Sequence, residues 1–192
     1  LYVLVNLSIR VVLNPVAPDA LAPVVEEAHA AGIPVILVTN RVDTDQFTSL
    51  ILADQVEFGR IGGDFLMEQL GCEGKIIVLN GLEGISTSDE RRQGLLDSIA
   101  ACPDSGANVE ILAEEDAVWA YDQGKLAVER MLAAYPEIDG VYSQGGAMTQ
   151  GAIDAFVAAG RPLVPMTGED NNGFMLAWLE RIVRRRRDRR RF

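Results

Sequence analysis

Polar side chains stand where short apolar runs end in this 192-residue chain. Four of them fit this description best, namely Asn14, Asn40, Arg41 and Asp54. Asparagine, aspartate and arginine carry planar groups that can hydrogen-bond to the hydroxyls of a ligand. In an open parallel sheet, ligands collect at the carboxyl ends of the strands. If the apolar runs are parallel strands, these four residues are candidate ligand-binding residues.

The residue types that most enzymes need are sparse. The chain has one histidine, His29, which leaves little room for a catalytic triad and argues against a zinc site. Residues 81–88, GLEGISTS, have the glycines and hydroxyls of a phosphate-binding loop but lack its lysine. Residues 90–98, ERRQGLLDS, fit the start of a helix better than an acid/base pair. We therefore expect no catalytic residue, no metal and no cofactor.

Residues 11–41 predict a strand, a helix and a second strand. Asp19 is the expected N-cap of the helix, and apolar residues then recur at helical spacing. Gly32 can adopt the left-handed conformation that ends a helix. The run 33–39, IPVILVT, is apolar on both faces, as a buried parallel strand must be. This pattern predicts an α/β fold.

The same alternation continues to the end of the predicted fold. Strands are expected at 49–52, 75–81, 108–114, 139–145 and 161–168, and helices at 58–70, 88–101, 123–134, 147–159 and from Asn171. Strict alternation of strand and helix indicates parallel sheets with right-handed crossovers. The adjacent Gly62 and Gly63 each weaken their helix, so we expect them to admit close backbone packing.

An ordered set of motifs resembles the periplasmic sugar-binding proteins of the ribose-binding type. These proteins serve ABC importers and share their fold with the cores of LacI-type repressors. The motifs are VVLNPVAPDALAPVVEEAHAAGIPVILVTNR, LADQVEFGRIGGDFL, GLEGISTSDERRQGL, VYSQGGAMTQGAIDAF and VPMTGEDNNGF, which together span roughly residues 11–179. No motif is specific alone, and the resemblance rests on their order and spacing.

The resemblance implies the type 1 periplasmic binding protein fold, in which two Rossmann-like lobes with parallel sheets enclose a ligand cleft. We expect residues 1–73 to be part of the amino-terminal lobe, residues 74–180 the carboxy-terminal lobe and residues 181–192 an Arg-rich tail. The boundary is placed at residues 71–74. The first lobe is incomplete, because the family's first two βα units are not visible here.

The resemblance also implies ligand-binding residues in the second lobe. Trp119 matches a position where relatives place an aromatic ring against the sugar, and Asp170 matches an aspartate that bonds sugar hydroxyls. Asp89 stands where many relatives carry an arginine, so Arg91 could take over that role. Gly145 and its neighbour replace the Asn-Asp pair of relatives, which predicts a roomier or less polar wall.

Each candidate residue also has a structural alternative. Asn14 precedes a proline and could be a turn residue. Asp89 could cap the following helix, and Trp119 could be core packing. Arg41 and Asp170 could be ordinary surface residues. The sequence leaves these alternatives open.

The net charge of −11 combines two very different parts. Residues 181–192 hold eight arginines and one aspartate, so the remaining residues carry −18. A body so acidic repels phosphate backbones and anionic lipid, so neither nucleic acid nor a membrane surface is expected as its partner. No apolar run approaches the ~20 residues of a membrane span, so no membrane insertion is expected either. The tail is expected to be solvated and disordered or foreign to the natural protein, with a patch for nucleic acid or an acidic partner as the alternative.

Cys72 and Cys102 are the only cysteines of the sequence, and a count of two does not indicate whether they form a disulfide. In the expected fold both lie at the same end of a sheet, so a disulfide would be possible in an oxidising compartment. Two unpaired buried thiols are the favoured reading.

Taken together, the sequence predicts a solute-binding protein that captures a sugar or polyol between two lobes and delivers it to an ABC permease. Lobe closure would be its functional event. The expected location is periplasmic or extracytoplasmic, although residues 1–9 do not resemble a signal peptide. The alternatives are the effector-sensing core of a LacI-type repressor and an α/β enzyme acting on a sugar phosphate.

Overall fold

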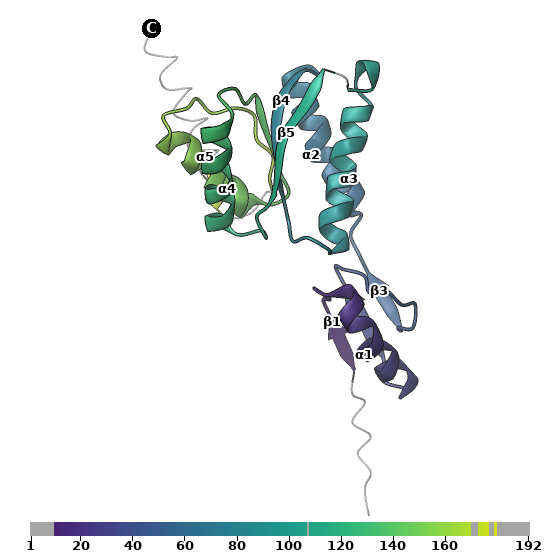
Figure 1. Ribbon diagram of the computed structural model, residues 1–192. Coiled ribbons are helices and arrows are strands. Elements are labelled where there is room, and N and C mark those ends of the chain that lie inside the picture. The colour runs from purple at the N-terminus through teal and green to yellow at the C-terminus, as the bar shows by residue number, and fades with distance from the viewer. Residues whose placement is uncertain (1–9, 107, 170–172, 177–178, 180–192) are drawn as a thin grey trace, which may run out of the picture.

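The computed structural model describes residues 10–106, 108–169, 173–176 and 179. In this part of the chain, two α/β units follow one another (Figure 1). The first unit contains β1 (Val11–Leu13), α1 (Pro18–Ala30), β2 (Val35–Val38) and β3 (Ser49–Ile51). Its strands form a parallel sheet in the order β1-β2-β3. The predicted strand–helix–strand unit is therefore confirmed.

Helix α1 covers one face of the first sheet. Val25 packs there against Val35 and Leu37, and all three are buried. On the opposite face, Val12 and Ile51 keep 66% and 60% of their surface exposed. Parallel sheets are normally covered on both faces, whereas among the described residues a helix covers one face of this sheet.

The start of α1 differs from the expectation. The helix begins at Pro18, its N-cap is Ala17, and no side chain caps it. Proline suits the first helical turn because its missing N–H has no intrahelical partner there. Asp19 lies inside the first turn, where its negative charge interacts favourably with the positive end of the helix dipole.

The second unit holds the larger core of the molecule. Its elements are α2 (Gln55–Leu70), β4 (Gly74–Asn80), α3 (Ser86–Ala100), a 3-10 turn (Pro103–Gly106), β5 (Val109–Asp116), α4 (Tyr121–Ala134), β6 (Gly140–Ser143) and α5 (Gly146–Ala158). The strands are parallel in the order β5-β4-β6. These elements confirm the predicted alternation, and their ends shift by at most a few residues.

Helices lie on both faces of this second sheet, α2 and α3 on one and α4 and α5 on the other (Figure 1). Successive residues of β4 point to opposite faces. Ile77 packs in the core with α4 and α5, whereas Ile76 and Val78 pack in the core with α2 and α3. All three have no exposed surface, which explains why β4 is apolar throughout.

The strand predicted at residues 161–168 does not form as a strand. Only Met166 makes a ladder contact, an isolated parallel bridge to Val141. Prolines at 162 and 165 lack the N–H that a strand donates. The segment is instead anchored by backbone bonds on either side of the bridge, from Val141 to Pro165 and from Thr167 to Val141.

Helix α2 packs with the second unit. Leu66 and Met67 share a buried cluster with Ile76 and Val78 of β4. A boundary at residues 71–74 would cut this cluster, so we propose that the first unit ends at residues 52–54 instead. The sequence pattern alone does not choose between the two boundaries, because an amphipathic helix can cover either neighbouring sheet.

Glycines bring α2 and α3 together. A Cβ atom at Gly59 would lie 2.8 Å from Cα of Arg91, and one at Gly63 would lie 2.6 Å from Oγ of Ser98. Real Cβ atoms do not come so close. Gly62 is different, because a Cβ there would make an ordinary contact with the Tyr142 ring at 3.4 Å. Of the two glycines expected to admit close packing, the structure confirms Gly63.

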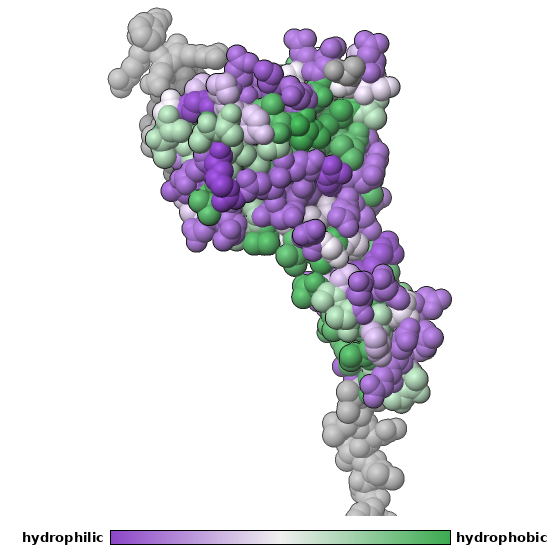
Figure 2. Space-filling model, in the orientation of Figure 1, coloured by the Kyte–Doolittle hydropathy of each residue, from purple (hydrophilic) through white to green (hydrophobic). Residues whose placement is uncertain are grey.

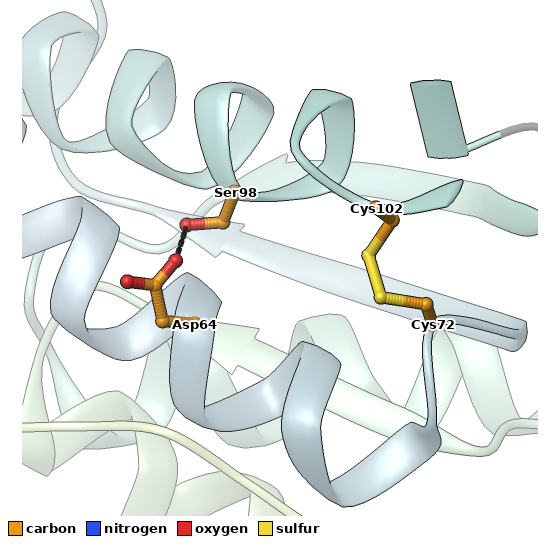
Figure 3. Close-up of a disulfide and its surroundings, with 4 residues drawn as sticks. All are labelled: Asp64, Cys72, Ser98 and Cys102. Atoms are coloured by element: carbon orange, nitrogen blue, oxygen red, sulfur yellow. Dashed lines mark hydrogen bonds between the residues drawn. A yellow bond between two sulfur atoms is a disulfide. The ribbon is translucent and has the colours of Figure 1, made fainter. Parts of the chain in front are cut away.

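A disulfide joins Cys72 and Cys102, whose Cα atoms are 5.7 Å apart (Figure 3). The expectation of two unpaired thiols is therefore wrong. The reason is the packing of α2 on α3, which brings the carboxyl ends of both helices together. At least one helical turn before each cysteine, the same two helices are also joined by a hydrogen bond of 2.7 Å, which Ser98 donates to Asp64 (Figure 3).

Some expectations fall outside the described residues. These are the Arg-rich tail 181–192, the first residues of the helix expected from Asn171, and Asp170. Residues 173–176 are helical, and Phe174 is buried in the core with α4 and α5. Among the described helices, none combines the length and the apolar character needed to cross a membrane.

Candidate functional site

A cleft of about 380 Å³ lies where the two units meet, at the carboxyl ends of their strands. The first unit contributes Asn14, Val16, Thr39 and Asn40. The second unit contributes Leu82, Ile85, Thr87, Arg91, Val118, Trp119 and Glu169. In Figure 2 the units meet at a narrow waist, where hydrophobic and hydrophilic side chains lie together. The volume is within the range of small-molecule sites.

Asn40 connects the two units. Its side-chain amide donates to Oδ1 of Asn14 at 2.8 Å, and its Oδ1 accepts a bond of 2.6 Å from the Thr87 hydroxyl. The Thr87 backbone N–H also points to this oxygen, at 3.4 Å. Helix α3 has no capping side chain of its own, so Asn40 of one unit caps a helix of the other. Asn40 lines the cleft, but its hydrogen bonds hold the units in place.

Arg91 is the most constrained charged residue of the cleft. Its guanidinium donates to the Gln55 side chain at 2.9 Å, to the Gln144 carbonyl at 2.6 Å and to Glu169 at 2.9 Å. It also stacks 4.0 Å above the ring centroid of Phe58, a distance suited to a cation–π contact. These contacts fix the side chain before a ligand arrives.

Trp119 lies against two glycines, and both are needed for its position. A Cβ at Gly145 would lie 2.6 Å from the indole Cδ1, and a Cβ at Gly81 would clash with the indole Cζ2. Val118 and Trp119 have φ values of 44° and 55°, a strained region for such bulky residues. The expectation was a roomier or less polar wall, and the indole occupies the space that Gly145 leaves, so the wall is apolar there and not wider.

A buried polar network supports this wall. Gln144, which has no exposed surface, accepts a bond from the Gly81 N–H and donates to Asn80 at 2.8 Å. Asn80 in turn donates to Glu114, which also receives a two-pronged ion pair from Arg92. The hydrogen bond from Arg92 lowers the pKa of Glu114 despite partial burial. The network holds the ends of β4, β5 and β6 in register.

Tyr142 supports the backbone beneath the cleft. It is buried, and its hydroxyl donates toward the carbonyls of Arg91 and Gly59, at 3.0 and 3.3 Å. Burial raises the pKa of the phenol, so the hydroxyl stays protonated and remains a donor. Tyr142 therefore fixes the crossing point of α2 and α3, from which Arg91 extends.

Not every residue predicted for the site lies in the cleft. Arg41 is exposed and pairs with Glu90 at 3.3 Å, outside the cleft lining. Asp54 caps α2, where it accepts a bond of 2.9 Å from the Glu57 N–H. Asp89 is exposed in the first turn of α3 and does not cap the helix. Asp170 lies outside the described residues.

The structure adds residues that sequence reasoning missed. Glu169 lines the cleft and pairs with Arg91, and Thr87 connects α3 to Asn40. Gln55 and Gln144 hold the Arg91 guanidinium. Glu169 directly precedes Asp170, which was already a predicted site residue, so the sequence offered a reason to consider Glu169 as well. The glutamines offered none, because Gln55 begins α2 and Gln144 follows β6, and neither position reveals its partner before folding.

The described cleft offers fixed hydrogen-bond donors and acceptors together with an aromatic ring. Arg91, Glu169 and Asn14 supply the polar groups, and Trp119 supplies the ring. This combination suits a small ligand with many hydroxyls and a weakly apolar face. Among the described residues, no cluster of histidine, cysteine or carboxylate side chains could hold a metal ion.

Comparison with known proteins supplies the family. The family model described as periplasmic binding protein domain matches residues 10–183. The chain belongs to this family. The ribose import binding protein RbsB of Escherichia coli is 31% identical over 158 residues, which cover 82% of this chain and 52% of RbsB. The xylitol-binding protein of Mycolicibacterium smegmatis is 31% identical over 161 residues, covering 83% and 45% of the two chains.

Solved structures agree with the assignment. The fructose-binding periplasmic domain of a hybrid two-component system superimposes with a TM-score of 0.78 at 32% identity, covering 84% of this chain and 53% of that one. The arabinose ABC transporter binding protein of Shewanella sp. ANA-3 gives a TM-score of 0.72 at 29% identity, with 78% and 50% covered. These matches confirm the type 1 periplasmic binding protein fold.

The chain spans about half the length of these relatives. In the described residues of the first unit, a helix covers one face of the sheet, which agrees with this partial length. The family consists of binding proteins. A binding protein needs a shaped cleft with fixed polar groups, and that is what the described residues provide.

Proposed function

We propose that this chain is the sugar- or polyol-binding part of a solute-binding protein that serves an ABC importer. The observation that carries the proposal is the cleft between the units, where Arg91 and Trp119 stand together on the second unit. A guanidinium donates to ring hydroxyls and an indole covers the apolar face of a sugar ring. The ligand would be held and released without chemical change.

The relatives support the class of ligand and partner. Their names specify ribose and xylitol, and the solved neighbours bind fructose or arabinofuranose. Import binding proteins deliver their ligand to a permease, so we propose an ABC permease as the partner. This support favours import over the LacI-type alternative, since the relatives are import proteins.

The proposed location is outside the cytoplasm, as for the periplasmic relatives. The disulfide between Cys72 and Cys102 is an independent argument, because disulfides persist mainly in oxidising compartments. The bond lies at the carboxyl end of α3, and the cleft lies at its amino end. It would therefore stabilise the second unit without touching the ligand.

A thermal-shift screen of the 192-residue chain against pentoses, hexoses and pentitols tests the proposal. A ligand that binds only the folded state stabilises it by about 2.7 kcal/mol at 100 times its dissociation constant. One sugar or polyol is expected to raise the melting temperature with a saturating dose dependence. A cooperative melt that no member of the panel shifts would count against the proposed ligand class.

Substitution of Arg91 by methionine is expected to weaken binding of the ligand found in that screen about 100-fold. Hydrogen bonds to a charged group contribute about 1.5–3 kcal/mol, and one tenfold change corresponds to about 1.4 kcal/mol. Isothermal titration calorimetry measures the effect. Arg130→Met is the matched control, because Arg130 pairs with Glu115 on the surface and does not line the cleft. Equal losses in both variants would contradict the assigned role of Arg91.

Substitution of Gly145 by asparagine is expected to destabilise the fold by about 2 kcal/mol, through the clash of its Cβ with Trp119. The indole must move, so its fluorescence should shift toward that of a solvated tryptophan. Urea unfolding measures the loss. The cause is tested by introducing Gly145→Asn into a Trp119→Ala variant and comparing the double variant with Trp119→Ala alone. Most of the loss in stability should then disappear, because the indole that clashes is gone. A loss that persists without the indole would disprove this contact as its origin.

A further inference from the structure

We propose that the ion pair between Arg91 and Glu169 restricts the cleft to uncharged polyhydroxylated ligands and excludes sugar acids. The inference rests on the proposed function, and it names the ligand class of the same cleft. Arg91 and Glu169 are the only charged residues among the described residues that line the cleft. Their atoms Nη1 and Oε1 are 2.9 Å apart.

The pair is sheltered from water. The Arg91 side chain keeps 10% of its surface exposed and the Glu169 side chain 28%. Charges in such a place are screened far less than charges on an open surface. Arg91 cannot turn away from Glu169, because Gln55, the Gln144 carbonyl and the Phe58 ring hold its guanidinium. The cleft therefore presents one fixed positive charge that is already neutralised.

Hydrogen-bonding capacity remains on both partners. Within the described part of the chain, no residue accepts a bond from Nη2 of Arg91, and none donates to Oε2 of Glu169. A donor and an acceptor thus remain on neighbouring side chains of one wall. A ligand hydroxyl group can accept a hydrogen bond from Nη2 of Arg91 and donate one to Oε2 of Glu169. Two adjacent hydroxyl groups can bind one to each of these atoms.

A ligand carboxylate fits this arrangement poorly. It has acceptors only, so it cannot satisfy the Glu169 oxygen. It would also bring a second negative charge next to Glu169, and like charges placed together in a desolvated site are strongly unfavourable. Arg91 alone would attract a carboxylate, so Glu169 is the residue that sets the preference. Glu169 is a specificity-determining residue of the cleft.

The test compares neutral ligands with their carboxylated counterparts on the 192-residue chain and on Glu169→Gln. The pairs are D-galactose with D-galacturonate, D-glucose with D-glucuronate, and xylitol with D-xylonate, so that each acid keeps the ring or open-chain form of its neutral partner. Glutamine keeps an oxygen acceptor for Arg91 and loses the charge. The natural chain is expected to bind the acid at least about 100-fold more weakly than its neutral partner. In Glu169→Gln the ratio should fall to about tenfold or less.

Glu137→Gln is the matched control, because it removes one negative charge at the exposed pair with Lys75, outside the cleft lining. It should leave the ratio unchanged. The inference is overturned if the natural chain binds an acid as well as its neutral partner, or if Glu169→Gln leaves the ratio where it was. A change of equal size in Glu137→Gln would overturn it as well, since the net charge alone would then explain the effect.

Inorganic sulfate separates this inference from the proposed function. With its negative partner removed, Arg91 should bind an anion, so sulfate should raise the melting temperature of Glu169→Gln more than that of the natural chain. If no sugar binds either protein but this difference is present, sugar binding is refuted and the charge preference stands. If a neutral sugar binds but sulfate stabilises both proteins equally, sugar binding stands and the charge preference fails.

Discussion

Replacement of Cys72 and Cys102 by alanine is expected to lower the free energy of unfolding by about 4 kcal/mol. The disulfide closes a loop with a sequence separation of 30 residues, and its removal gives the unfolded chain more conformations. For a chain of this size, the loss corresponds to a fall of about 8–16 °C in melting temperature. Differential scanning calorimetry of the oxidised protein and the double variant measures it.

Reduction of the natural chain provides the control. Dithiothreitol removes the same cross-link and leaves both sulfur atoms in place, so the reduced protein should melt close to the double variant. Agreement between the two shows that the cross-link, and not a packing defect at the buried Cys102, causes the loss. If reduction leaves the melting temperature unchanged, the predicted contribution of the bond is wrong.

Substitution of Gly59 by alanine is expected to destabilise the fold by about 3 kcal/mol. Alanine is the better helix former by about 1 kcal/mol, so propensity alone predicts the opposite sign. The new Cβ would lie 2.8 Å from Cα and 2.7 Å from the carbonyl carbon of Arg91, so α2 and α3 must move apart. Because Arg91 starts from this crossing point, its place in the cleft should be disturbed too.

Gly62→Ala is the matched control on the same helix. Its Cβ would find only an ordinary contact with Tyr142 at 3.4 Å, so this variant should be neutral or slightly stabilising. Urea unfolding of both variants gives the two free energies. The prediction fails if Gly59→Ala is as stable as Gly62→Ala, because the helices would then have room for a methyl group.

Much of the architecture could be predicted from local hydrophobic patterns in the sequence. Apolar runs on both faces of β2 and β4 predict buried parallel strands, and the alternation of such runs with amphipathic segments predicts the helices between them. Strand ends predicted the edge of the candidate cleft, and Asn14 and Asn40 line this cleft. These features depend on near neighbours in the chain, so a linear pattern contains them.

Contacts between distant residues could not be predicted in this way. The sequence placed Asn40 at the site, but only folding shows that its amide is bound to Asn14 and Thr87. Gly145 seemed to widen the cleft, and the structure fills its space with Trp119. In both cases the decisive partner comes from another element.

The sequence by itself determined the family and the alternation of strands and helices, and it predicted the edge where a ligand would bind. The tertiary structure decided which sheet α2 covers, that Cys72 and Cys102 pair, and that Arg91 meets Glu169. The physical reason is that hydrophobic patterning is read along the chain, whereas helix crossings and ion pairs depend on geometry between segments far apart in it.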